Sequence, residues 1–98
     1  MENSILISIQ KWYASQCDGD WEHEYGIMID TLDNPGWSVT IDLIGTELEE
    51  KKFSDINSQI SVTNWVQCSV KNKKFHGAGG AENLFDVLET FLKWTKSQ

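Results

Sequence analysis

Two segments in which apolar and polar residues alternate lie on either side of the tetrapeptide Asp33-Asn34-Pro35-Gly36, and this arrangement restricts the fold more than any other feature of the chain. An alternation of period two is typical of strands with one buried face. Pro35 and Gly36 suit the two central positions of a type II turn, because glycine takes the positive φ of the second position without steric cost. The sequence therefore predicts an antiparallel hairpin with strands at residues 25–33 and 37–44.

A turn at this place also predicts which side chains of the hairpin share a face. It sets Ile29 beside Ile41 and Thr31 beside Val39 on one face. The opposite face then carries polar side chains, which are Asp30, Thr40 and Asp42.

Apolar residues at helical spacing predict a helix at each end of the chain. The N-terminal helix covers about residues 3–16, with Asn3 or Ser4 as its N-cap and Trp12 on its apolar face. The C-terminal helix covers about residues 81–96, with acidic residues near its start and lysines near its end. Its wide apolar face is expected to pack on the sheet.

The segments between the hairpin and the last helix predict two further strands. Residues 45–58 form a polar connection, with a short edge strand near Leu48 or Phe53. Strands are expected near 60–71, with a bulge or a break at Asn64-Trp65, and near 74–76, after which glycines 77–80 end the sheet in a tight turn. The prediction is therefore an α+β fold with about four antiparallel strands, in a single domain spanning residues 1–98.

Charge is distributed unevenly along the chain. Residues 1–50 contain eleven acidic residues and one lysine, a net charge of −10, whereas residues 51–98 carry a net charge of +3 and arginine is absent throughout. Phosphate contacts dominate the binding of nucleic acids and anionic membranes, so neither is expected as a partner. A basic protein fits better, although the charge could also serve solubility alone. With no long apolar run and no basic N-terminal signal, we expect a cytoplasmic protein.

Four carboxylates lie within seven residues between the first helix and the hairpin, namely Asp18, Asp20, Glu22 and Glu24. An EF-hand loop starting at Asp18 would need glycine at its sixth position and glutamate at its twelfth, where the chain has His23 and Ile29. No metal site is therefore expected. If the first strand starts as early as Trp21, Glu22 and Glu24 join Asp30 and Asp42 on one acidic face.

Two other residue types raise rival functions. Cys17 and Cys68 lack the spacing of a zinc or redox motif, yet Cys17 with His23 or His76 would suit a nucleophile–base pair in a small, sulfurtransferase-like enzyme. No basic residues cradle either thiol in the sequence, so catalysis is not expected. Tryptophans at loops or strand ends could anchor a protein or stack on a sugar, and these are Trp21, Trp37 and Trp65.

Three stretches together resemble the bacterial immunity protein 53 family. They are residues 12–26 (WYASQCDGDWEHEYG), residues 31–39 (TLDNPGWSV), and residues 75–80 (FHGAGG) followed by Asn83-Leu84 and a helix that closes on FLKW at 91–94. The resemblance runs over nearly the whole chain in the same order, while residues 45–63 match poorly. It implies a protein encoded beside a secreted polymorphic toxin, which protects its own cell by binding that toxin and carries no catalytic residue or cofactor.

A tight interface with a basic, nuclease-like toxin needs complementary charge and aromatic anchors, and the acidic first half of the chain contains both. We predict that the partner-binding surface includes Asp18, Asp20, Trp21, Glu22, Glu24, Asp30, Trp37 and Asp42. The alternative contact is the variable segment 45–63.

Overall fold

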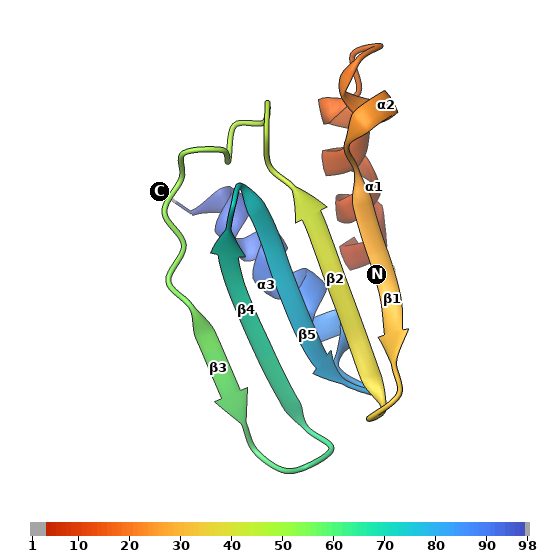
Figure 1. Ribbon diagram of the computed structural model, residues 1–98, viewed down its shortest axis with the longest axis vertical. Helices are drawn as coiled ribbons and strands as arrows, with labels where there is room; N and C mark the ends of the chain where they lie inside the picture. Colours follow the sequence, from red (N-terminus) through yellow and green to blue (C-terminus); the bar gives the residue numbers. More distant parts are fainter. Residues whose placement is uncertain (1–3, 98) are drawn as a thin grey trace.

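A computed structural model describes residues 4–97, in which helices cover one face of a five-stranded antiparallel sheet (Figure 1). The strand order is β1-β2-β5-β4-β3, so that β1 and β3 form the two edges. The elements along the chain are α1 (Ser4–Gln16), α2 (Trp21–Glu24), β1 (Ile27–Leu32), β2 (Gly36–Asp42), β3 (Ile56–Gln59), β4 (Trp65–Lys71), β5 (Lys74–Gly80) and α3 (Leu84–Lys96). The predicted α+β class and the two terminal helices are confirmed, with five strands instead of about four. Asn3, one of the two expected caps of the first helix, lies outside the described residues.

The β1–β2 hairpin is confirmed, but its predicted register is wrong by two residues. Ile29 lies opposite Val39, and Ile41 lies opposite Ile27. Because a shift of two keeps every side chain on its face, the division into a core face and a polar face still holds. Gly36 does not have the positive φ of a turn residue. It is the first residue of β2 and pairs with Leu32 of β1 and with Gly80 of β5. The predicted type II turn therefore does not form.

Glycines occupy the middle of the sheet for steric reasons. A Cβ atom on Gly36 would collide with the carbonyl oxygen of Gly79 on β5, and one on Gly77 would collide with Val87 of α3. Residues 77–80 were expected to end the sheet, yet they belong to its central strand, β5. The absence of side chains lets the neighbouring strand and α3 approach this strand closely. Helix α3 accordingly begins at Leu84, later than predicted.

The polar connection folds differently from the prediction. Its edge strand is β3, whereas Leu48 lies buried in a turn and Phe53 packs edge-on against Phe75 and Trp94. Ile60 and Val62 were expected in a strand but stand exposed in the β3–β4 turn. The break at Asn64-Trp65 is confirmed, since β4 begins at Trp65.

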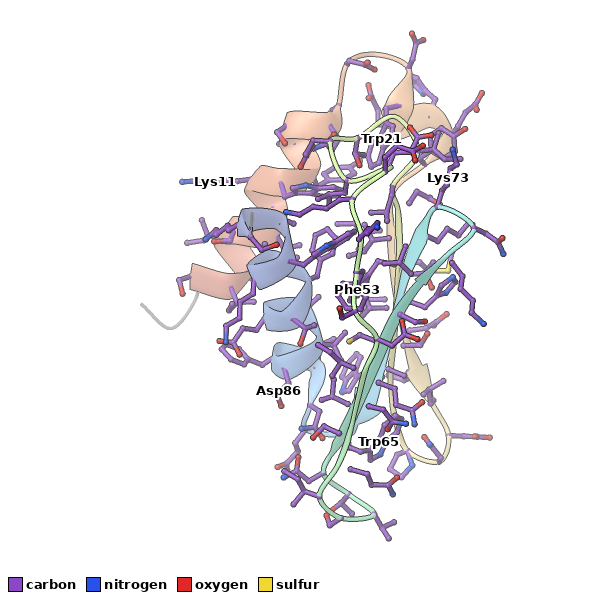
Figure 2. The ribbon with its side chains drawn as sticks, turned by 90° about the vertical axis from the view of Figure 1, so that its left-hand side faces the viewer. Lys11, Trp21, Phe53, Trp65, Lys73 and Asp86 are labelled. Atoms are coloured by element: carbon purple, nitrogen blue, oxygen red, sulfur yellow. The ribbon has the colours of Figure 1, made fainter. Side chains whose placement is uncertain are left out.

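Aromatic side chains join the helices to the sheet. Phe91 of α3 is fully buried, and its ring lies 5.0 Å from that of Trp12 in α1 and 5.2 Å from that of Phe75 in β5. Figure 2 shows both long helices on the same side of the sheet, with the other face uncovered. None of the helices within residues 4–97 has the length and apolar character needed to cross a membrane.

Candidate protein-interaction surface

Residues 18–24, called here the acidic segment, connect α1 to β1. The carboxylate of Asp18 accepts the backbone N–H groups of Trp21 and Asp20 at 3.0 and 2.9 Å, and these two bonds lower the pKa of Asp18. The pKa of Glu22 is also lowered, by its own backbone N–H and by those of Asp18 and Gly19, which donate to its carboxylate at 2.9 and 2.8 Å. Both carboxylates therefore hold the turn in place in addition to carrying charge.

The other two carboxylates of the acidic segment point into solvent. Asp20 and Glu24 are exposed, and their side chains make no hydrogen bond or ion pair with any residue between 4 and 97. Glu22 and Glu24 lie in α2, because Tyr25 donates its N–H to the carbonyl of Trp21 at 2.9 Å and closes a helical turn. The conditional prediction of a strand from Trp21, with these glutamates on one face beside Asp30 and Asp42, is therefore wrong.

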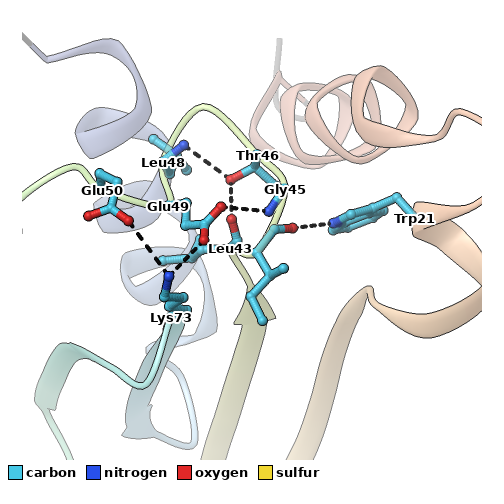
Figure 3. Close-up of polar contacts among 9 residues, drawn as sticks. Trp21, Leu43, Gly45, Thr46, Leu48, Glu49, Glu50 and Lys73 are labelled. Carbon is cyan, nitrogen blue, oxygen red and sulfur yellow. Dashed lines mark hydrogen bonds and ion pairs between the residues drawn. The ribbon is translucent and has the colours of Figure 1, made fainter.

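The two tryptophans of the predicted surface are held by the protein itself. Trp21 is only 6% exposed, and its Nε1 donates to the carbonyl oxygen of Ile44 at 2.8 Å (Figure 3). Trp37 is half-buried, and its Nε1 donates to the carbonyl oxygen of Ala81 at 2.9 Å. Trp21 thus supports the acidic segment from beneath, where a partner has little access to its ring.

Lys73 in the β4–β5 turn and Lys74 at the start of β5 pair with three other acids at this end of the sheet. Lys73 lies between Glu49 and Glu50, with Nζ to carboxylate distances of 2.8 and 3.6 Å (Figure 3), and its hydrogen bond with Glu49 lowers the pKa of that carboxyl. Asp42 lies 3.4 Å from Lys74 and accepts the backbone N–H of Gly26 at 3.0 Å. The acidic segment has no such lysine among the described residues, so no ion pair with lysine neutralises its charge there.

The predicted site residues fall into two groups. The acidic segment and Asp42 meet at the end of the hairpin where β1 begins. Asp30 and Trp37 lie at the other end of the hairpin, near its turn, where they pair with Ser38 and Thr31 respectively. The eight predicted residues therefore do not form one continuous patch.

Two hollows beside the sheet were not foreseen. One, of about 410 Å³, lies on the helix-free face across β2, β5, β4 and β3, and its lining includes the polar side chains of Ser38, Thr40, Gln67, Ser69 and His76. The other, of about 430 Å³, lies between α1 and β1 and is lined by Ile9, Gln10, Tyr13, Tyr25, Gly26 and Ile27. Both depend on the order of distant segments in space. The second brings Tyr13 of α1 together with Tyr25, and these aromatic side chains were the signal available in the sequence.

The two cysteines lie in different environments. Cys17 donates its thiol to the carbonyl oxygen of Tyr13 at 3.4 Å. Cys68 is buried in the core, and this burial raises the pKa of its thiol to about 11. Within residues 4–97, no three histidine, cysteine, aspartate or glutamate side chains lie close enough to hold a metal ion.

We expect an alkylating reagent at about pH 8 to modify Cys17 in the folded protein and to leave Cys68 intact, because only the thiolate reacts and the raised pKa of Cys68 keeps it protonated. Peptide mass spectrometry after timed iodoacetamide treatment measures both sites. The same treatment in concentrated urea is the control, and there both thiols should react. Equal reactivity of Cys68 in the two conditions would show an accessible, activated thiol.

A comparison with protein-family models matches residues 6–96 to the model described as Immunity protein 53. No curated protein and no solved structure matches the chain. The matched range runs from Leu6 in α1 to the end of α3, and so includes the acidic segment and both hollows.

Proposed function

The chain belongs to the immunity protein 53 family, which indicates an immunity function, and we propose that it binds and neutralises a cognate bacterial toxin as a stoichiometric protein inhibitor. The observation that carries the proposal beyond the family is the acidic segment, whose carboxylates lack lysine partners within residues 4–97 and of which Asp18, Asp20 and Glu24 are exposed. The action proposed is binding alone, in the cytoplasm, with no substrate transformed and no cofactor used.

The charge of the chain indicates what kind of toxin would fit. With a net charge of −7, the protein attracts a positively charged partner and repels nucleic acid. Toxins that act on nucleic acids need basic surfaces, so we propose a basic, nuclease-like toxin. Complementary charge raises the association rate above the roughly 10⁵–10⁶ M⁻¹s⁻¹ of neutral protein pairs. An inhibitor gains from fast capture, because a toxin acts from the moment it enters the cell.

The rival functions have less support. A sugar-stacking platform needs exposed indole rings, yet of the three tryptophans considered for it Trp21 is only 6% exposed, and Trp37 and Trp65 are half-buried. A cysteine-dependent enzyme needs a reactive thiolate, and the burial of Cys68 disfavours one there.

Neutralising Asp20 and Glu24 together, as Asp20→Asn/Glu24→Gln, is expected to slow association with the toxin about tenfold at low salt and to flatten the salt dependence of the association rate. These two residues are chosen because Asp18 and Glu22 also hold the turn. The measurement is stopped-flow or surface-based kinetics with the purified toxin domain encoded by the neighbouring reading frame, over a series of salt concentrations.

The matched control is Asp55→Asn/Glu82→Gln, which removes the same charge from two exposed residues outside the acidic segment. Equal slowing by both double variants would mean that net charge alone steers the encounter. Wild-type protein that fails to bind this toxin domain, or that turns over a small molecule, would contradict the proposed function.

A further inference from the structure

The outer edge of β1 is unpaired among the described strands, because β1 stands first in the sheet and hydrogen-bonds to β2. Gly26 accepts the N–H of Asp42 with its carbonyl oxygen at 3.1 Å. Hydrogen-bonding direction alternates along an antiparallel pair, so Ile27 and Ile29 direct their own N–H and C=O groups away from β2. Such a row of unsatisfied backbone groups is a template on which another extended chain can pair.

The helix side of this edge is apolar. The hollow between α1 and β1 has Tyr13 and Tyr25 on its two sides, and both rings pack against Trp21, with centroid distances of 6.0 and 6.2 Å. Leu6 precedes Tyr13 by seven residues, about two turns, and therefore lies on the same face of α1. Ile29 follows Ile27 on the same face of β1. Leu6 and Ile29 are 56% and 42% exposed. Apolar surface that the protein itself leaves uncovered therefore lines the edge over several residues.

The opposite side of the same edge carries carboxylates beside apolar side chains. A smaller hollow of about 230 Å³ lies there, and its lining includes Glu24, Asp42 and Lys74 together with Met28, which is 64% exposed. Lys74 already pairs with Asp42, which leaves the carboxylate of Glu24 without a cation among the described residues. Farther along this face of β1, Asp30 is exposed as well. A chain running along β1 would thus meet apolar side chains on one side and, on the other, the two carboxylates of Glu24 and Asp30 with Met28 between them.

We propose that the toxin adds an extended segment to the outer edge of β1, with apolar side chains directed into the hollow beside α1 and lysine or arginine side chains directed toward Glu24 and Asp30. Successive side chains of a strand point to opposite faces, so one segment with alternating apolar and basic residues satisfies both sides. The inference rests on the proposed function and specifies how the toxin is recognised.

A second copy of this chain is a poorer occupant of the edge. Antiparallel pairing of two β1 strands about Ile27 would bring Glu24 of one copy toward Asp30 of the other. Like charges placed across a strand pair are destabilising, and each copy carries a net charge of −7. A basic partner converts the same two carboxylates into attractive contacts.

The test uses variants that separate the backbone edge from the apolar hollow, with the toxin domain encoded by the neighbouring reading frame as the probe. Ile29→Pro removes an N–H that points away from β2, so the hairpin should stay intact while strand addition is blocked. Ile29→Thr keeps that N–H and removes apolar surface, as does Leu6→Gln. We expect the dissociation rate to rise about tenfold for Leu6→Gln and for Ile29→Thr, and about 100-fold for Ile29→Pro.

Ile7→Gln is the matched control, because Ile7 is 47% exposed on the same helix but points away from the hollow. Its dissociation rate should stay within about twofold of the wild-type value. Thermal unfolding confirms that each variant is folded, and Leu6→Gln keeps the test decisive if the proline variant does not fold.

Three results would overturn the inference, and they differ in meaning. Equal dissociation rates for the wild-type protein, Leu6→Gln and Ile29→Thr would place the interface elsewhere. That result would not contradict the proposed function. Wild-type protein that does not bind the toxin at all would remove the proposed function and the inference with it. A wild-type dimer, seen by light scattering and dissolved by Ile29→Pro, would assign the edge to a second copy.

Discussion

Replacing Phe91 by alanine is expected to lower the free energy of unfolding by about 3–5 kcal/mol, a large share of the 5–15 kcal/mol typical of a domain. Phe91 is fully buried, and its ring contacts Trp12 of α1, Phe75 of β5 and Trp94 of α3. The truncation therefore opens a cavity at the point where both helices meet the sheet. Urea unfolding followed by tryptophan fluorescence and by circular dichroism measures the loss.

Phe85→Ala is the control for this prediction, since it makes the same chemical change in the same helix at a side chain that is 52% exposed. We expect it to cost less than about 1 kcal/mol. Similar losses for the two variants would show that helix propensity, and not burial at the junction of the layers, sets the cost. A Phe91 variant that unfolds with a much smaller loss would contradict the assigned core.

Substituting Gly36 by alanine is expected to cost about 2–3 kcal/mol, at the upper end of what overpacking usually costs. The added Cβ would collide with the carbonyl oxygen of Gly79, a backbone atom of the paired strand that cannot turn aside as a side chain can. The φ angle of Gly36 is not in the left-handed region, so the cost is steric and not conformational. Hydrogen exchange of the β2 and β5 amides should report the widened spacing between these strands.

Gly26→Ala is the matched control for the glycine prediction. Gly26 lies just before β1, has no atom within 4 Å of a built Cβ, and does not have a positive φ. Alanine there should leave the stability unchanged or raise it by a few tenths of a kcal/mol, because it reduces the freedom of the unfolded chain. If Gly36→Ala proves as mild as Gly26→Ala, the close approach of β2 and β5 does not require glycine.

These stability effects bear on binding as well. The edge of β1 is held in place through β2, whose other side pairs with β5, and through the packing of α1 on α3. Gly36→Ala disturbs the first of these supports and Phe91→Ala disturbs the second. Neither residue lies on the proposed interface, so any loss of toxin affinity in these variants should follow the loss of stability.

Local patterns of apolar residues identified the helices and strands that bury one face at a regular spacing. The alternation on both sides of Pro35 predicted the hairpin, and the apolar faces around Trp12 and Phe91 predicted the two helices that pack on the sheet. These predictions succeeded because a helix or a strand must bury one face, and the spacing of apolar residues reports that face directly.

The predictions that were wrong share one cause, which is that contacts between distant segments decide these features. Gly36 reads locally as a turn residue, yet its role comes from Gly79, which lies on the neighbouring strand β5. Trp21 reads as an exposed anchor, yet the carbonyl of Ile44 and the rings of α1 bury it. Glu22 reads as part of an acidic face, yet it holds the turn that it belongs to.

The amino-acid sequence by itself determined the α+β class, the two helices and their buried faces, the hairpin and the concentration of acid in the first half of the chain, because each follows from residue type and spacing along the chain. Only the tertiary structure decided the strand register, the place of β3, which carboxylates are paired with lysines, and which side chains lie on the two sides of the free edge of β1. These depend on which strand lies beside which and how closely, and close approach between segments far apart in the chain is a property of packing that no local pattern encodes.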